Sequence, residues 1–234
     1  MADNVPKHVV FVPDGNRRFA RKHGKHPSEG HRAGADTFRE VLKWCKELGI
    51  KEVTFWGAST ENLKRDKLEL EFLFKLFGEL CDEVMKRSAE NHPDRASVKF
   101  CGALHMLPKW LQERFAEAEK ATMGSHEYKL NLLIAYGGRE ELLQAVRSIA
   151  RDASEGKLSS DKITGDTIMS RLYLQSEPDL IIRTGHACMS GLLPWQSVYS
   201  EIIFLEEKHW PEFNREDLEA CLKEYSERIR NFGK

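Results

Sequence analysis

Short apolar segments alternate along the chain with longer amphipathic segments. Those of strand length lie at residues 8–12, 52–57, 97–101, 129–135, 180–182 and 202–204. Between them, apolar side chains recur at helical spacing over residues 34–49, 68–88, 108–121, 140–153 and 215–230, and residues 159–174 contain at least one more helix. The repeated strand–helix units predict a single α/β domain over residues 1–234, with a mostly parallel central sheet flanked by helices.

Polar loops that contain arginine, glycine, asparagine, serine or threonine follow several of the predicted strands. Residues 14–18 read DGNRR, residues 59–65 read STENLKR, residues 136–140 read YGGRE and residues 183–185 read RTG. In a parallel sheet the carboxyl ends of the strands meet at one edge, where α/β proteins place their binding sites. Arginine forks bind phosphate oxygens in pairs, and glycine lets backbone N–H groups approach. The sequence therefore predicts a diphosphate site at this edge.

The DGNRR loop has two interpretations. In the structural one, Asp14 caps the following helix and Gly15 relieves strain in the turn. In the functional one, the helix N-terminus and Arg18 hold a diphosphate, and Asp14 holds a magnesium ion. A hard cation such as Mg²⁺ prefers carboxylate oxygen beside phosphate oxygen, so the second interpretation has a chemical basis. The residues alone leave both open.

Composition narrows the class of protein. The formal net charge of -1 provides no overall basic field, so a nucleic-acid partner is not expected. The five cysteines are odd in number and lack CxxC spacing, which argues against a disulfide framework or a structural zinc site and favours a reducing compartment. Residues 1–7 are polar and show no signal peptide, and no window of 18 residues is wholly apolar. We expect a cytoplasmic protein, with transient contact at a membrane surface left open.

Single residues outside the DGNRR loop are weaker signals. Ser59 and Asn62 with Arg65 fit either a helix cap beside a solvated charge run or part of a site. His31, taken by itself, is more typical of a capping or packed histidine than of a site residue.

Two further residues raise a chemical question. Glu201 lies in the apolar run 198–205, where an unpaired carboxylate is costly, so a metal or an arginine partner is expected. Cys188 has no catalytic-cysteine signature around it, so we do not expect a thiol nucleophile.

Ordered sequence blocks resemble those of the cis-prenyltransferase (undecaprenyl diphosphate synthase) family. The blocks are PDGNRRFA at 13–20, GHxxG at 30–34, STENxxR at 59–65, Asn131 with YGGRE at 136–140, PDLIIRTG at 178–185, PWQSxYxE at 194–201 and WPEF at 210–213. The resemblance runs from about residue 8 to residues 231–233. Any one block is a weak signal, but the full set in this order is very specific.

The resemblance implies a homodimer with a hydrophobic tunnel for the growing prenyl chain. It also implies a Mg²⁺-dependent enzyme that condenses an allylic prenyl diphosphate with a five-carbon isoprenoid diphosphate, usually isopentenyl diphosphate, and releases pyrophosphate. Small residues at the end of the second strand, Gly57 and Ala58, would leave room for a prenyl tail.

The resemblance also assigns roles to individual residues. Asp14 holds the metal, and Asn16 and Ser59, placed in the catalytic set with Asn62, assist proton removal or positioning. Arg18, His31 and Arg65 bind or orient the allylic diphosphate, and Gly15 and Arg17 are counted with the residues that bind substrate. Arg183, Ser190 and Glu201 occupy the positions that hold the second substrate and its metal.

The sequence departs from the family pattern at two points, which indicates an atypical member. Pro27 stands where the family usually has an arginine before the Gly-His pair. Residues 183–190 are one residue shorter than usual, and Cys188 stands where an arginine clamps the second diphosphate. Cysteine cannot replace a permanently charged fork, and losing such a contact costs about 1.5–3 kcal/mol, which is roughly ten- to a hundredfold in affinity.

Several functional hypotheses follow from that departure. Dimethylallyl diphosphate could replace isopentenyl diphosphate as the acceptor and give a branched, head-to-middle product, with His186 as a new phosphate contact or base. Alternatively Arg17 fills the gap and ordinary cis elongation continues. A third hypothesis is a non-catalytic partner subunit, but Asp14, Asn16 and Arg18 are all present. A nucleotide-binding protein is not expected, because the chain lacks a GxGxxG or P-loop lysine motif.

Overall fold

One parallel sheet organises the molecule, as the sequence predicted. The computed structural model describes residues 5–90, 96–124 and 127–228. The sheet has the order β3-β4-β2-β1-β5-β6, and every pair of neighbouring strands is parallel. Its strands are β1 His8–Val12, β2 Glu52–Trp56, β3 Ser97–Cys101, β4 Lys129–Leu133, β5 Leu180–Thr184 and β6 Glu201–Leu205. The chain forms a single α/β domain around this sheet.

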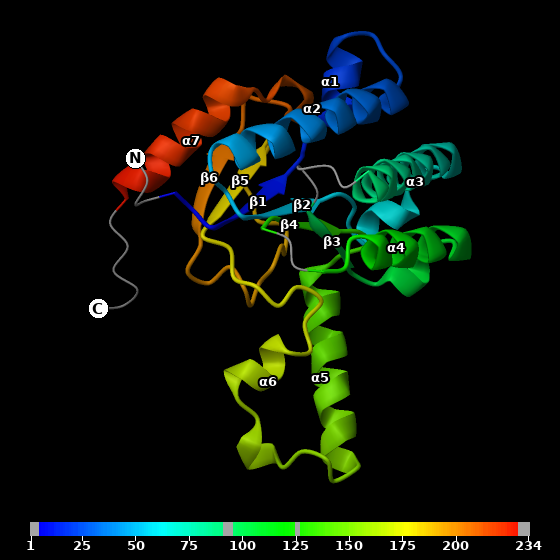
Figure 1. Cartoon of the computed structure of the whole chain (residues 1–234), viewed down its shortest axis with the longest axis vertical. Coiled ribbons are helices and arrows are strands. Elements are labelled where there is room, and N and C mark those ends of the chain that lie inside the picture. The colour runs from blue at the N-terminus through cyan, green and yellow to red at the C-terminus, as the bar shows by residue number, and fades with distance from the viewer. Residues whose placement is uncertain (1–4, 91–95, 125–126, 229–234) are drawn as a thin grey trace.

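Helices cover the sheet and extend beyond it (Figure 1). They are α1 Asn16–Lys22, α2 Pro27–Glu47, α3 Lys67–Ala89, α4 Lys109–Ala121, α5 Gly138–Ser154, α6 Gly165–Met169 and α7 Arg215–Glu227. α1 packs on α2, and α3 packs on α4, whereas α5 projects from the body of the molecule with α6 beside it. None of the described helices is long and apolar enough to cross a membrane.

The central strands are apolar on both sides, which is typical of a parallel sheet with helices on both faces. All five residues of β1 are buried. Phe11 of β1 stacks on Phe55 of β2 with ring centroids 5.0 Å apart, and Trp210 packs against both rings. This aromatic cluster holds the segment that carries Trp210 against β1 and β2.

Helix α2 begins at Pro27, earlier than the predicted start at residue 34. His26 caps the helix, Pro27 occupies its first position and Glu29 completes a capping box. His31 is therefore a buried residue in the second turn of a helix and not part of a loop. Gly34 is needed for packing, because a Cβ there would lie 2.4 Å from Asn16 Oδ1.

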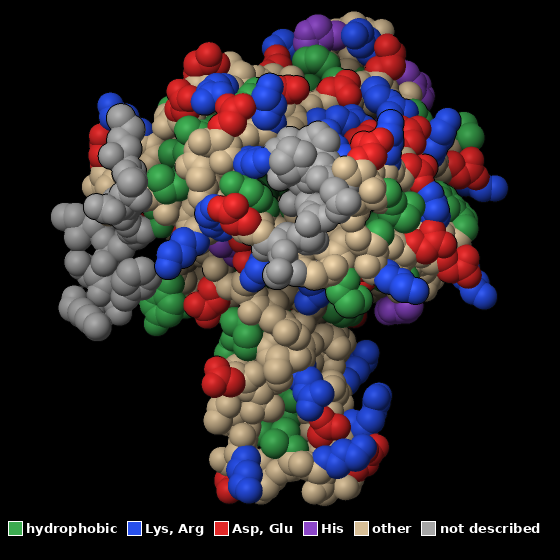
Figure 2. Space-filling view, in the orientation of Figure 1, with side chains coloured by type: hydrophobic (Ala, Val, Ile, Leu, Met, Phe, Trp, Pro, Cys, Tyr) green, Lys and Arg blue, Asp and Glu red, His purple; other side chains and the backbone are tan. Residues whose placement is uncertain are grey.

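The strand order determines which loops can meet. β1 lies between β2 and β5, so the segments that follow these three strands are neighbours at one edge of the sheet. The face shown in Figure 2 mixes acidic and basic side chains and is not uniformly basic. Phosphate binding must therefore depend on a local cluster at that edge.

Candidate active site

A pocket of about 430 Å³ opens at the carboxyl ends of β1, β2 and β5. It collects every predicted site residue except His186 and Glu201. The predicted residues that line it are Asp14, Gly15, Asn16, Arg17, Arg18, His31, Ser59, Asn62, Arg65, Arg183 and Ser190. Loops from three strands and residues of α1 and α2 thus converge on one cavity.

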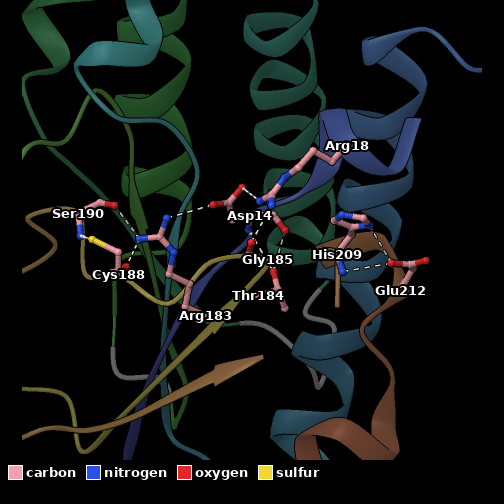
Figure 3. Close-up of polar contacts among 9 residues, drawn as sticks. All are labelled: Asp14, Arg18, Arg183, Thr184, Gly185, Cys188, Ser190, His209 and Glu212. Atoms are coloured by element: carbon pink, nitrogen blue, oxygen red, sulfur yellow. Dashed lines mark hydrogen bonds and ion pairs between the residues drawn. The ribbon is translucent and has the colours of Figure 1, made fainter. Parts of the chain in front are cut away.

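Asp14 lies between two arginines (Figure 3). Its Oδ1 accepts a hydrogen bond from Arg18 Nη2 at 2.8 Å, and its Oδ2 accepts one from Arg183 Nη2 at 3.0 Å. Burial by itself would raise the pKa of the Asp14 carboxyl, but the hydrogen bonds from Arg183 and Arg18 outweigh burial and hold this pKa below its ordinary value. Asp14 is therefore an ionised carboxylate at neutral pH.

The main chain holds Asp14 in place as firmly as its side chain does. Thr184 Oγ1 donates to the Asp14 carbonyl oxygen at 2.8 Å, and Trp210 N donates to the same oxygen at 2.9 Å. Asp14 is not the cap of α1, since Gly15 occupies that position with φ +104° and no side chain caps the helix. A Cβ on Gly15 would lie 2.7 Å from His209 Cδ2, so only glycine fits this turn. The capping interpretation of Asp14 is wrong.

Arg183 organises the loop that follows β5. Its Nη1 donates to Ser190 Oγ at 2.8 Å and to the Cys188 carbonyl oxygen. Its side chain is only 7% exposed, and Nε is buried without a hydrogen-bond partner in the described chain. Three of the five N–H donors of this arginine are thus used by Asp14, Cys188 and Ser190.

Gly185 completes the same corner of the pocket. Arg18 Nη1 donates to the Gly185 carbonyl oxygen at 2.7 Å. Gly185 has φ +74°, and a Cβ there would lie 2.6 Å from Arg18 Nη2. The glycine of the RTG sequence therefore allows Arg18 to reach Asp14.

On the other side of the pocket, three basic residues share one carboxylate. Glu69 Oε1 lies 3.0 Å from His31 Nε2, 3.2 Å from Arg65 Nη1 and 3.6 Å from Arg17 Nε. Burial lowers the pKa of the His31 imidazole, although the hydrogen bond and charge of Glu69 act in the opposite direction. The sequence-based reasoning missed Glu69, although its spacing of four residues from Arg65 is a detectable helical signal.

Ser59 and Asn62 hold each other in a tight turn at the mouth of the pocket. Asn62 N donates to Ser59 Oγ at 3.2 Å, and Ser59 N donates to Asn62 Oδ1 at the same distance. The Ser59 hydroxyl accepts in this pair, and it also hydrogen-bonds the carboxylate of Glu61. Arg21 also lines the pocket and was not predicted, although it lies one helical turn after Arg17.

Glu201 is not part of this pocket. It is the first residue of β6 and pairs with Leu180, the first residue of β5, which places it at the amino edge of the sheet. Its Oε2 accepts a hydrogen bond from Arg228 Nη1 at 2.5 Å. The expected arginine partner is confirmed, and Glu201 as a metal ligand stays a prediction, with Asp14 at the opposite, carboxyl edge of the sheet.

His186 and Arg17, the two candidate replacements for the arginine that is missing at Cys188, lie in different parts of the structure. His186 is exposed in the loop after β5 and does not line the pocket. Arg17 lines the pocket on the α3 side, where its Nε lies 3.6 Å from Glu69 Oε1. Cys188 itself is exposed, and its thiol accepts a weak hydrogen bond from Ser190 N at 3.4 Å.

The floor of the pocket near β2 is apolar and closely packed. Trp56 and Gly57 line it. A Cβ on Gly57 would lie 2.6 Å from Ile134 Cδ1 and 3.4 Å from Phe77 Cε1. The hydrophobic tunnel for the prenyl chain stays a prediction.

The carboxylates of the described residues are suited to a metal ion that a bound ligand also coordinates. No cluster of three or more histidine, cysteine, aspartate or glutamate side chains in that part of the chain could hold a metal ion. Asp14 is ionised and 34% exposed, and each of its oxygens keeps a lone pair beyond its arginine contact. Mg²⁺ is commonly bound by one or two carboxylates together with substrate phosphates, which fits this donor set.

Comparisons with known proteins agree on one family. A family model described as "Putative undecaprenyl diphosphate synthase" matches residues 12–233. A protein of Methanopyrus kandleri is 44% identical over 98% of this chain and 85% of its own length, and one of Thermoplasma volcanium is 42% identical over 98% and 89%. Both are named tritrans,polycis-undecaprenyl-diphosphate synthase (geranylgeranyl-diphosphate specific).

Solved structures show the same relationship. Lavandulyl diphosphate synthase from Lavandula x intermedia, in complex with dimethylallyl diphosphate, superposes with a TM-score of 0.93 at 31% identity and covers 99% of this chain and 100% of that one. A probable undecaprenyl diphosphate synthase from Campylobacter jejuni gives a TM-score of 0.78 at 28% identity, with 99% and 100% covered.

Fold and pocket together define an α/β protein with arginines gathered around one carboxylate at the sheet's carboxyl edge. The chain belongs to the undecaprenyl diphosphate synthase family, and it is an enzyme that transfers prenyl groups. The resemblance inferred from the sequence blocks is thereby confirmed.

Proposed function

We propose that the enzyme condenses an allylic prenyl diphosphate with isopentenyl diphosphate and releases pyrophosphate, in ordinary cis elongation. The observation that carries this proposal is Asp14 held between Arg18 and Arg183 in a pocket that four more basic side chains line. This arrangement provides paired cationic donors for two diphosphates around one ionised carboxylate.

The basic residues divide into two groups that match two substrates. His31 and Arg65 share Glu69 on the α3 side, and together with Arg18 of α1, which also contacts the Gly185 carbonyl oxygen, they would bind the allylic diphosphate. Arg183 and Ser190 lie in the loop after β5 and would bind the acceptor. The charge of the Arg183 guanidinium, which lines the pocket, supports this assignment, since an anionic diphosphate would pair with it.

Asp14 would hold Mg²⁺ together with diphosphate oxygens. When bound, the ion would supply charge neutralisation for the departing pyrophosphate. Arg18 and Arg183 would orient the Asp14 carboxylate toward the diphosphate. Ser59, held by Asn62, and Asn16 on α1 line the same pocket, where they would orient the acceptor and take part in removing its proton.

The proposal is tested by incubating the purified protein with Mg²⁺, a panel of allylic donors and isopentenyl diphosphate. Pyrophosphate release and the mass of the products are measured. A ladder of linear products that differ by five carbons supports the proposal. Absence of magnesium-dependent pyrophosphate release from every donor refutes it and favours a non-catalytic partner subunit.

A second candidate reaction uses dimethylallyl diphosphate as the acceptor and gives a branched, head-to-middle product. Two observations favour it. Arg183 contacts the carbonyl oxygen of Cys188, where a family arginine is expected, and the similar lavandulyl diphosphate synthase was solved with dimethylallyl diphosphate. The same assay with dimethylallyl diphosphate alone distinguishes the candidates, because NMR of the product shows whether the new carbon skeleton is branched.

We also infer a homodimer. Large apolar side chains are exposed on α5 and on the segment before β6: Leu143 is 48% exposed, Val146 is 61% exposed and Val198 is 67% exposed. Exposed apolar side chains grouped on one part of a molecule favour a protein interface. Light scattering after size-exclusion chromatography measures the mass directly, and a mass of 27.0 kDa would refute the inference.

A cytoplasmic location with transient contact at membrane surfaces remains part of the proposal. Its support is chemical, since a prenyl product is apolar and partitions into lipid. Flotation with liposomes, before and after turnover, measures this contact, and protein that stays in the soluble fraction in both cases would contradict it.

A further inference from the structure

Glu69 has an unusual position for a carboxylate beside an anion-binding pocket. It lies in the first turn of α3, its side chain is 10% exposed, and it does not itself line the pocket. Yet its Oε1 contacts three basic residues that do line it, and they come from separate segments: Arg17 from α1, His31 from α2 and Arg65 from the loop before α3.

We propose that Glu69 is a positioning residue that orients His31, Arg65 and Arg17 for the allylic diphosphate. The inference rests on the proposed function, because it assigns this side of the pocket to the donor substrate. Glu69 acts through its three partners and need not contact substrate itself. It differs from Asp14, whose carboxylate lies in the pocket and is 34% exposed.

The chemistry of the bond to His31 determines which imidazole nitrogen is available. An ionised carboxylate only accepts hydrogen bonds, so His31 Nε2 must carry the proton in the 3.0 Å contact with Glu69. Nδ1 is then the nitrogen left for a ligand. A second contact from a carboxylate commonly fixes the orientation of a functional imidazole in this way.

The position of Glu69 also predicts how kcat and KM change when its carboxylate is removed. A negative charge near an anion site opposes anion binding, so removing it should not weaken substrate binding by charge alone. The loss should instead appear in geometry, since a displacement of about 1 Å at a reacting centre costs up to about a hundredfold in rate. A positioning role thus predicts a fall in kcat without a rise in KM for the allylic diphosphate.

The experiment compares Glu69→Gln and Glu69→Ala with a matched control, Glu79→Gln. Glu79 lies on the same helix and accepts a hydrogen bond from Arg32 of α2 at 2.5 Å, but neither residue lines the pocket. The control therefore breaks another α2–α3 ion pair without touching the site. kcat, KM for the allylic donor and Tm are measured for all variants.

The expected result is a fall in kcat of about tenfold to a hundredfold for Glu69→Ala and a smaller fall for Glu69→Gln, which keeps the acceptor oxygen. KM for the donor should stay equal or decrease, and Tm should match that of Glu79→Gln. An unchanged kcat, or a kcat that falls equally in Glu79→Gln, would overturn the proposal.

A spectroscopic measurement separates this inference from the proposed function. In ¹⁵N-histidine-labelled protein, His31 should be in the Nε2–H form, and Glu69→Ala should convert it to a mixture of forms; an unchanged His31 signal would overturn the inference. This readout needs no turnover. A wild-type chain without prenyl transfer would refute the proposed function, while the His31 spectrum would still decide the role of Glu69.

Discussion

Arg183 Nη2 donates a hydrogen bond to Asp14 Oδ2 at 3.0 Å, and this contact joins the end of β5 to the loop after β1. The arginine is nearly buried, whereas the carboxylate is about one-third exposed. Removing one partner of a largely buried charge pair leaves the other uncompensated. This ion pair therefore holds the Asp14 carboxylate in position and favours its ionised form.

Asp14→Asn should abolish most of the activity. Asparagine keeps the shape of the side chain but removes the charge that would hold Mg²⁺ and order two arginines. We expect kcat to fall by about a hundredfold to a thousandfold, as for other losses of electrostatic stabilisation. Magnesium-dependent pyrophosphate release measures the effect, and circular dichroism checks the fold.

Asp36→Asn is a suitable control for that variant. Asp36 is an exposed residue of α2 that pairs with Arg39 at 3.0 Å and does not line the main pocket. It should retain wild-type turnover. Equal activity in Asp14→Asn and Asp36→Asn would remove Asp14 from the chemistry.

The stability that Asp14 contributes should depend on pH. Its pKa is lower in the folded chain than its ordinary value of about 3.9, because Arg183 and Arg18 outweigh the effect of burial. The folded state then binds fewer protons than the unfolded state, so this stabilisation is present above pH 4 and decreases as the pH falls through the folded-state pKa.

Urea unfolding of the wild type and Asp14→Asn at several pH values tests the sign. The wild type should be the more stable at pH 7, and the difference should shrink toward pH 3. A difference that widens on acidification would mean that the arginines do not stabilise the ionised carboxylate.

Cys188→Arg should strengthen binding of isopentenyl diphosphate. The loop now offers a backbone carbonyl to Arg183 at this residue and no second guanidinium. A charge-assisted contact to a diphosphate contributes about 1.5–3 kcal/mol, so KM for isopentenyl diphosphate should fall by roughly ten- to a hundredfold. Cys188→Ser adds no charge and should leave KM unchanged; a similar KM for the arginine variant would show that another group already binds this diphosphate.

Phe77→Ala should change product length. Phe77 and Ile134 pack behind Gly57 on the floor of the pocket, so the shorter side chain opens space for a longer prenyl tail. Mass spectrometry should show longer products than the wild type makes, at some cost in stability. Met123→Ala, at a side chain that is 77% exposed, is the control, and identical product distributions in all three proteins would place the tail elsewhere.

Much of the site was predictable because parallel strands bring their carboxyl ends together. The sequence places the loops that begin at Asp14 and Ser59, and the RTG sequence with Arg183, at one edge of the sheet, and they meet in one pocket. Glu69 was missed because its role depends on the packing of α3 against α2. Arg21 was missed although helical spacing places it on the face of Arg17.

The errors also have physical causes. The start of α2 was predicted seven residues late, because the Pro27 and Glu29 capping signals were not used. For Glu201 the apolar run predicts a metal or an arginine partner, because burial cost alone does not distinguish the two, and the structure supplies Arg228.

The sequence by itself determined the strands, the order of the loops and the family, because these follow from local periodicity and from residue types at fixed spacings. The tertiary structure decided which charges meet: Arg183 with Asp14, Glu69 with His31 and Glu201 with Arg228. These pairs join residues far apart in the chain, and their partners depend on strand order and helix packing, which local sequence does not encode.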